Sequence, residues 1–249
     1  MPEGPSLVIL REQARVFEGR RILRVEGNTT IDTGRLKGRT VQAVRTWGKH
    51  FLLELPTVAL RIHLLMFGSY CIDERKEEKV PRLSLRLARK HEFNFYSCSV
   101  KFIEVPLDEA YDWAADVMAD EWDPKLARKR LKAMPDTIVA DALLEQDVFA
   151  GVGNIIKNEV LFRIRVHPES TIGALPPRKL GELIKQARDY SFDFLAWKQA
   201  FVLKKHYQVH TKTICPRDGN RLTYRKHLGR AQRRAFFCEV CQKRYPPEA

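Results

Sequence analysis

The hydrophobic and polar positions change their period along the 249-residue chain. Near the start, apolar residues recur at the spacing of one helix face: Leu7, Leu10, Ala14 and Phe17. This spacing predicts a helix over residues 5–17. From about residue 21 to 105 the chain shows short β-rich runs, in which Leu83, Leu85 and Leu87 alternate with polar residues. Such runs are typical of half-buried strands and predict an antiparallel sandwich or barrel.

Beyond Pro124 the apolar spacing becomes helical. The predicted helices cover residues 125–132, 137–147, 154–164 and 177–200. The acidic, polar stretch 116–124 separates the two patterns and is a reasonable hinge between domains. The last 49 residues are basic and contain cysteines, which predicts a small β-rich finger.

The charge of the chain favours a polyanionic partner. Its formal net charge is +13, and the last 49 residues hold twelve Lys or Arg against three Asp or Glu. An ordinary solvated surface mixes both signs, so this excess indicates nucleic-acid binding, with ribosome association or anionic lipid as alternatives. The chain contains no apolar run of about 18 residues, so no membrane span is predicted. The N-terminus gives no reason to expect secretion. A monomer without a membrane partner is expected.

Three of the five cysteines lie within the last 35 residues. Cys238 and Cys241 form a C-x2-C pair, and Cys215 precedes Cys238 by 23 residues. Without a secretion signal, this spacing favours a zinc ion over disulfides. An aspartate stands where the fourth cysteine of such a site would fall. Three residues are therefore candidates for the fourth ligand: Asp218, His210 and His227.

The N-terminal sequence MPEGP offers a nucleophile. Removal of Met1 would leave Pro2 with a free secondary amine, which can attack a sugar C1′ and form an iminium. Glu3 stands beside it as a candidate general acid. The ordinary alternative is a stiff leader into the first helix, with Glu3 placed favourably at the helix N-terminus.

Two turns carry further candidate residues. Lys49 lies in the turn between the runs QAVRTW and FLLEL, where a lysine is either a solvated hairpin residue or a phosphate or sugar contact. In the segment QDVFAGVGNIIKNEVLF, Gly151 and Gly153 allow a tight turn and Asn154 is the predicted N-cap of the next helix. Such a turn is either an ordinary helix hairpin or a phosphate site.

These motifs together resemble the formamidopyrimidine-DNA glycosylase and endonuclease VIII family along essentially the whole chain. The resemblance rests on five segments: MPEGP (1–5), WGKHFLLEL (47–55), IHLLMFG (62–68), GVGNIIKNE (151–159) and QRRAFFCEVC (232–241). It implies an α+β fold: an N-terminal antiparallel β-sandwich with flanking helices, and a C-terminal helix–two-turn–helix domain with a β-hairpin zinc finger. The expected domains are a catalytic sandwich at 1–118, a hinge at 119–124, the helical domain at 125–203 and the finger at 204–249.

The resemblance also implies roles for residues that match the family's motifs. Pro2 would be the nucleophile and Glu3 the acid that opens the sugar, while Lys49 would contact phosphate and assist at the sugar. Asn154 and Arg233 would bind backbone phosphates, and Met66 would fill the gap left by the extruded base. A structural zinc would be held by Cys215, Cys238 and Cys241, with Asp218 as the expected fourth ligand at the position of the family's fourth cysteine.

The implied reaction is base removal followed by β- and δ-elimination, on duplex DNA carrying an oxidised base or an abasic site. Residues 199–215 leave almost no room for the long loop of 8-oxoguanine enzymes, and MPEGP is closer to the endonuclease VIII branch. Oxidised pyrimidines are therefore the favoured substrates; formamidopyrimidines, hydantoins and single-stranded or bubble DNA are further candidates.

Three departures from the family pattern stand out: Ser6 in place of a glutamate, no Arg–Phe pair in residues 95–104, and Asp218 in place of a cysteine. Three alternative functions are considered: an 8-oxoguanine enzyme with a short loop, a non-catalytic DNA-binding protein on the same scaffold, and an RNA-binding zinc-ribbon protein.

Overall fold

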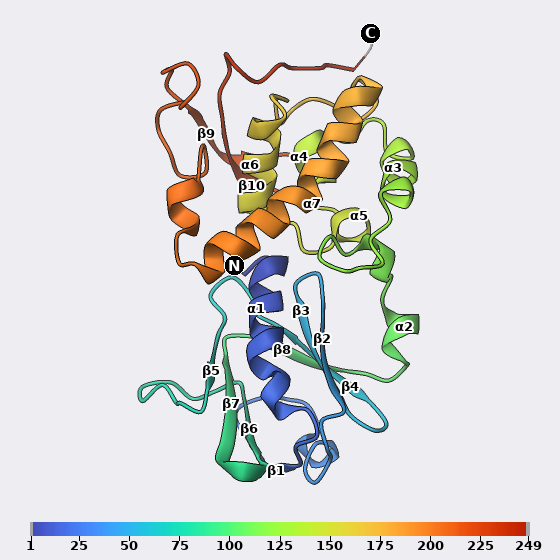
Figure 1. Cartoon of the computed structure of the whole chain (residues 1–249), viewed down its shortest axis with the longest axis vertical. Coiled ribbons are helices and arrows are strands. Elements are labelled where there is room, and N and C mark those ends of the chain that lie inside the picture. The colour runs from blue at the N-terminus through green and yellow to red at the C-terminus, as the bar shows by residue number, and fades with distance from the viewer. Residues whose placement is uncertain (1, 248–249) are drawn as a thin grey trace. The chain divides into compact units, whose positions relative to one another are not determined.

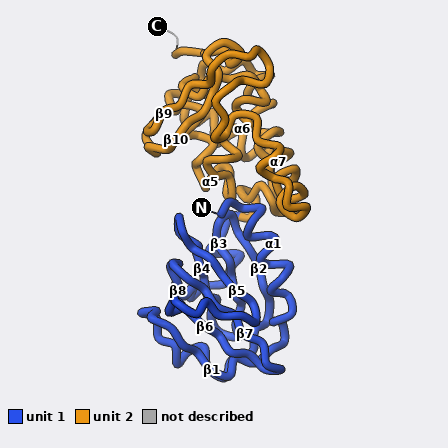
Figure 2. The backbone as a smooth tube through the Cα atoms, turned by 90° about the vertical axis from the view of Figure 1, so that its left-hand side faces the viewer, with its two compact units in different colours: residues 1–112 blue, residues 113–249 orange. Residues whose placement is uncertain are grey.

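A computed structural model describes residues 2–247 of the chain. The chain divides into two compact units, residues 1–112 and 113–249 (Figure 2). The predicted α+β fold is confirmed, whereas the finer boundaries predicted for the hinge and the finger stay predictions. Among the described residues, no helix is both long enough and apolar enough to cross a membrane.

The first unit is built on two antiparallel four-stranded sheets. One sheet has the order β1-β6-β7-β5: β1 (Ile22–Glu26), β6 (Leu83–Leu87), β7 (His91–Tyr96) and β5 (Ser69–Ile72). The other has the order β2-β3-β4-β8: β2 (Ala43–Trp47), β3 (His50–Glu54), β4 (Ala59–His63) and β8 (Ser99–Ile103). Two helices accompany the sheets, α1 (Gly4–Ala14) and α2 (Leu107–Ala110). Figure 1 shows α1 lying along the strands.

The core of this unit is aromatic and aliphatic. The predicted face of the first helix is confirmed, because its four apolar residues are all at most 1% exposed. Phe93 and Phe95 pack with a ring separation of 4.1 Å, and Phe17 lies 4.8 Å from Phe93. Full burial of one such side chain contributes roughly 1.5–3 kcal/mol. Since α1 packs against β2 and β3 through this core, its first residues have a fixed place on the sandwich.

The second unit is mainly helical (Figure 1). Its helices are α3 (Pro124–Lys132), α4 (Val139–Ala142), α5 (Gln146–Phe149), α6 (Asn154–Arg163) and α7 (Pro177–Gln199). A two-stranded antiparallel hairpin follows, formed by β9 (Thr223–Leu228) and β10 (Arg233–Phe237). Apolar residues of α6, α7 and β10 share one core, so the hairpin is packed against the helices.

The single helix predicted over residues 137–147 is wrong, because α4 and α5 are separate short helices. Glu145 has extended backbone angles, and the side chain of Gln146 donates to the carbonyl of Leu144 at 2.7 Å. This side-chain bond satisfies a carbonyl that a continuous helix would have bonded itself. The other three helices predicted in this unit correspond to α3, α6 and α7 within a residue or two at each end.

Candidate functional site

Pro2 and Glu3 lie at the start of α1. Pro2 is half-buried, and the side chain of Glu3 is 2% exposed. Glu3 is the N-cap residue of the helix, and its carbonyl accepts the Ser6 N–H at 2.8 Å. The structure therefore presents a partly accessible proline beside a buried carboxylate at a positively polarised helix end. Met1, whose removal the sequence predicts, lies outside the described residues.

Lys49 lies in a two-residue turn between β2 and β3. Trp47 pairs with His50 across this turn, and Gly48 has a φ of 53°, which suits the first position of a type II′ turn. The indole of Trp47 donates to the carbonyl of Asp112 at 2.9 Å, which holds the strand end in place. The half-buried Lys49 is thus carried on a rigid corner. Figure 1 shows this corner and the start of α1 at the same end of the first unit.

Two histidines beside this corner were missed in the sequence. His50 of β3 and His63 of β4 are register partners, with ring centroids 5.4 Å apart. Nδ1 of His50 lies 3.2 Å from the hydroxyl of Tyr111. Burial, aided by the charges of Arg61, His63 and Lys49, lowers the pKa of His50 to about 3. Burial likewise lowers the pKa of His63. This corner therefore combines two cations, Lys49 and Arg61, with neutral imidazoles. Such an environment favours an anion.

The loop between β4 and β5 carries Met66. Leu65, Met66 and Phe67 are 46%, 52% and 84% exposed, respectively. Gly68 anchors the loop, because a Cβ there would come within 2.8 Å of the Leu64 Cα and 2.9 Å of the Ser97 carbonyl oxygen. Three consecutive exposed apolar residues on an anchored loop are unusual for a surface that meets only water.

Asn154 is the first residue of α6 and is 9% exposed. The prediction that it is the N-cap is wrong by one residue, since Gly153 takes that position. The side-chain Oδ1 of Asn154 accepts a hydrogen bond from the Lys157 ammonium at 2.9 Å. Gly151 has a φ of 98°, as the predicted glycine turn requires.

Arg233 is the first residue of β10 and is half-buried. It pairs with Leu228 of β9, and the register shifts between Arg233 and Ala235. The side chain thus stands at an irregular position near the hairpin turn. Bulges of this kind re-aim side chains and are frequent next to binding sites.

The structure brings together the four predicted metal ligands: Cys215, Asp218, Cys238 and Cys241. Their ligand atoms all lie within 4.8 Å of one another. Sγ of Cys215 lies 3.8 Å from Sγ of Cys241, and Oδ2 of Asp218 lies 3.2 Å from Sγ of Cys238. Zinc–sulfur bonds of about 2.3 Å place two thiolates of a tetrahedron about 3.8 Å apart. The residues therefore fit a tetrahedral zinc ion with three sulfur ligands and one oxygen ligand.

The two histidines that the sequence left as alternatives lie outside this cluster. His210 is buried, and its Nδ1 lies 3.1 Å from Nδ2 of Asn158. His227 is exposed on β9. Burial raises the pKa of Cys238 to about 12, so a thiolate at this position would need the charge of a bound metal ion to stabilise it. The guanidinium of Arg217 also donates to Sγ of Cys241 at 3.6 Å, an outer contact that suits a thiolate.

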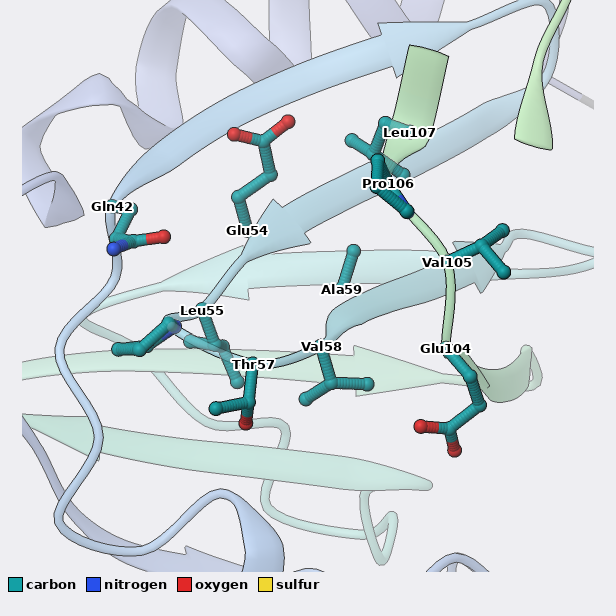
Figure 3. Close-up of a pocket in the computed structure, with 11 residues that line it drawn as sticks. Gln42, Glu54, Leu55, Thr57, Val58, Ala59, Glu104, Val105, Pro106 and Leu107 are labelled. Atoms are coloured by element: carbon teal, nitrogen blue, oxygen red, sulfur yellow. The ribbon is translucent and has the colours of Figure 1, made fainter. Parts of the chain in front are cut away.

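A separate groove of about 240 Å³ lies at the β3–β4 turn of the first unit (Figure 3). It is lined by apolar side chains such as Leu55, Val58 and Leu107, together with Glu54 and Glu104. Both carboxylates are paired with arginines. None of the predicted site residues lines this groove, so we do not assign the groove to the candidate site.

Comparison with known proteins identifies the family. The formamidopyrimidine-DNA glycosylase N-terminal domain matches residues 1–98, and the formamidopyrimidine-DNA glycosylase H2TH domain matches residues 113–190. The chain is 31% identical to mouse endonuclease 8-like 3 over 217 residues, which is 84% of this chain. The chain belongs to the formamidopyrimidine-DNA glycosylase and endonuclease VIII family. The resemblance read from the sequence is therefore confirmed.

The relatives within this family differ in length. The chain spans 36% of mouse endonuclease 8-like 3, whereas it covers the full length of endonuclease 8 2 from Mycobacterium tuberculosis at 28% identity, with 98% of this chain aligned. A formamidopyrimidine-DNA glycosylase from Lactococcus lactis, solved with DNA containing an abasic site, has the same fold with a TM-score of 0.84. That match has 23% identity and covers 97% of this chain and all of the other.

Proposed function

We propose that the chain is a bifunctional DNA glycosylase and AP lyase of base excision repair. It removes oxidised bases from duplex DNA, with pyrimidines favoured, and then cleaves the strand at the resulting abasic site. The observation that supports this most directly is the pairing of a partly accessible Pro2 with the buried carboxylate of Glu3. Family membership makes this pair the expected catalytic group.

In the proposed reaction, the nitrogen of Pro2 attacks C1′ of the damaged nucleotide and the C1′–N bond to the base breaks. The proton that the proline nitrogen loses balances the one that the departing base gains. Glu3 donates a proton to the ring oxygen O4′, which opens the sugar and leaves an iminium between C1′ and the proline nitrogen. Lys49 stands close enough to His50 and His63 to influence both, so its ammonium belongs to the same basic corner. That corner would hold a phosphate of the damaged strand.

The iminium makes a C2′ proton acidic, so loss of that proton expels the 3′ phosphate and a second elimination expels the 5′ phosphate. Together the two steps leave a one-nucleotide gap. The zinc ion would be structural: Cys215, Asp218, Cys238 and Cys241 would hold it, and the hairpin that carries Arg233 would depend on it for its fold.

The DNA contacts of the second unit form part of the same proposal. Asn154 at the start of α6 and Arg233 on β10 would each bind a backbone phosphate, since a helix N-terminus and an arginine both suit an anion. The exposed Met66 would enter the base stack where the damaged nucleotide has left it. The strongly basic C-terminal segment supports a nucleic-acid partner.

Borohydride trapping tests this function, because borohydride reduces the iminium to a stable amine. The untagged protein is incubated with duplexes that carry thymine glycol, 8-oxoguanine or an abasic site, and the adduct is mapped by mass spectrometry. We expect an adduct at Pro2, formed faster with thymine glycol than with 8-oxoguanine. The matched control has two residues added before Pro2 and should form none, whereas the same addition at the C-terminus should be harmless. Absence of any adduct at the abasic site would leave a protein that only binds DNA.

A further inference from the structure

Lys157 is a buried cation without a role in the proposed reaction. It lies on α6 one turn after Asn154 and is 1% exposed. Its Nζ donates to Oδ1 of Asn154 and to the carbonyl of Arg234, each at 2.9 Å. A buried ammonium costs several kcal/mol of desolvation unless acceptors surround it. An apolar residue at this position of α6 would avoid that cost, so the two bonds call for an explanation.

One of these bonds fixes how the Asn154 amide is turned. A lysine can only donate, whereas an asparagine amide has one acceptor atom and one donor group. The bond to Lys157 therefore holds Oδ1 towards the ammonium, and the Nδ2 hydrogens point to the opposite side of the amide. Asn154 is also the first residue of α6, whose leading N–H groups favour an anion. Without the lysine, the amide could turn its acceptor towards a phosphate and repel it.

The other bond reaches the hairpin that follows α7. The carbonyl of Arg234 belongs to β10, one residue beyond Arg233, at the point where the register shifts. The same ammonium thus fixes the backbone next to the proposed phosphate-binding arginine. A second tie secures the hairpin turn, because the buried Asp141 carboxylate accepts the N–H groups of Arg230 at 2.7 Å and Ala231 at 3.1 Å.

We propose that Lys157 is a positioning residue that couples the two phosphate-binding groups of this unit, Asn154 and Arg233. It orients the Asn154 amide and holds β10 at a fixed distance from α6, so that both groups meet one backbone in a set geometry. The inference rests on the proposed DNA binding but not on the proline chemistry. Together with Asp141, Lys157 ties the hairpin to the helices through buried charged groups as well as through apolar packing.

A double-mutant cycle on DNA affinity tests the coupling. The ligand is a duplex with a tetrahydrofuran abasic analogue, and the proteins are the wild type, Lys157→Met, Asn154→Ala and the double variant. We expect each single variant to weaken binding on the order of tenfold. In the Lys157→Met background, Asn154→Ala should cost almost nothing further, because the amide has already lost its orientation.

The matched control is Lys179→Met. Lys179 also donates to a backbone carbonyl, that of Ile164 at 2.7 Å, but this residue is the C-cap at the other end of α6. Asn154→Ala should keep its full effect in that background. If the effects of Lys157→Met and Asn154→Ala simply multiply, Lys157 only stabilises the fold and the proposal is overturned.

A second variant covers the case in which Lys157→Met does not fold. Lys157→Gln is neutral, and its side chain is one bond shorter than that of lysine, so its amide N–H groups cannot reach both acceptors at once. Asn154→Ala should then cost clearly less than in the wild type, and an undiminished cost would again overturn the coupling. If the wild-type protein binds the abasic analogue no better than undamaged DNA, the proposed function fails as well. That outcome is distinct from the one in which the effects of the two substitutions on affinity multiply.

Discussion

Oδ2 of Asp218 lies 3.2 Å from Sγ of Cys238, whereas His210 is hydrogen-bonded to Asn158 away from the cysteines. Among the candidates that the sequence left open, this relationship favours Asp218 as the fourth ligand of the proposed zinc site. The N–H of Asn220 donates to the Asp218 carboxylate, and this bond is the main cause that lowers the pKa of Asp218 to about 2. The carboxylate is therefore ionised and available to a metal at neutral pH.

Replacement of Asp218 should change how well the protein retains zinc, and the effect should depend on whether the new residue can bind the metal. Asp218→Ala leaves three sulfur ligands, so we expect zinc to be lost to a chelator at least about tenfold faster than from the wild type. Asp218→Cys restores four thiolates and should retain zinc at least as well as the wild type. Zinc content after dialysis against EDTA measures both. His210→Ala is the control for the alternative ligand, and zinc loss in that variant alone would contradict the assignment.

The sequence predicted those parts of the structure that depend on short-range patterns of residues. The apolar spacing of the first helix identified its buried face, and the C-x2-C pair identified the region of the metal cluster. The helix predicted over residues 137–147 failed because the break depends on a side-chain bond from Gln146 to the backbone. Periodicity alone carries no information about such a bond.

Buried charges were the other feature that the sequence could not reveal. Lys157 and Glu159 lie in the GVGNIIKNE motif, where a pattern-based interpretation places charged residues on the surface. Their burial depends on acceptors and donors far along the chain: Glu159 accepts the N–H groups of Gln208, Val209 and His210. The pairing of His50 with His63 likewise depends on strand register. Only the assembled fold brings these groups together.

Two glycines in the C-terminal region allow a matched test of the hairpin turn. Gly229 has a φ of +66°, and a Cβ there would lie 2.4 Å from a carboxylate oxygen of Asp141. Gly219 has a φ of +73°, but a Cβ there would meet nothing within 4 Å. Alanine at either site costs about 1 kcal/mol or more for its left-handed backbone.

Gly229→Ala should therefore destabilise the chain more than Gly219→Ala, because it also displaces the Asp141 carboxylate from its two backbone donors. Thermal unfolding of the zinc-loaded proteins measures the difference, at about 2–4 °C for each kcal/mol. Gly229→Ala should also weaken DNA binding. Equal melting temperatures for the two variants would show that Asp141 does not hold the turn.

His50 should make the stability of the chain depend on pH. Its pKa is lowered to about 3 in the folded state, mainly by burial, from an ordinary value of 6.5. The unfolded chain therefore binds a proton that the folded chain does not, so stability present above pH 6.5 is lost as the pH falls towards 3. For His50 alone, the free energy of unfolding falls by at most about 1.4 kcal/mol for each pH unit.

His50→Gln keeps an acceptor for the Tyr111 hydroxyl but does not titrate, so its stability should fall less between pH 6.5 and 4. Urea unfolding at several pH values measures the slope. Burial also lowers the pKa of His210, to about 4, so part of the slope should remain in the variant. Glu159 acts in the opposite direction, since burial raises its pKa. An identical slope in the variant and the wild type would exclude His50 as a source of the pH dependence.

Arg233→Ala should weaken binding to all DNA sequences alike and make binding less sensitive to salt. A phosphate contact releases about one counterion, so loss of the contact should reduce the slope of log affinity against log salt by about 1. Arg178→Ala is the control, because Arg178 is an exposed cation on α7 that pairs with Glu182. Its removal changes the net charge equally but should leave the slope unchanged.

Fluorescence anisotropy with the abasic-analogue duplex, between 50 and 300 mM salt, gives both slopes. An equal reduction in the two variants would mean that only the total charge of the chain matters. A reduction confined to Arg233→Ala would indicate a phosphate contact at the hairpin. Because Lys157 fixes the adjacent carbonyl of Arg234, Lys157→Met should shift the slope in the same direction as Arg233→Ala.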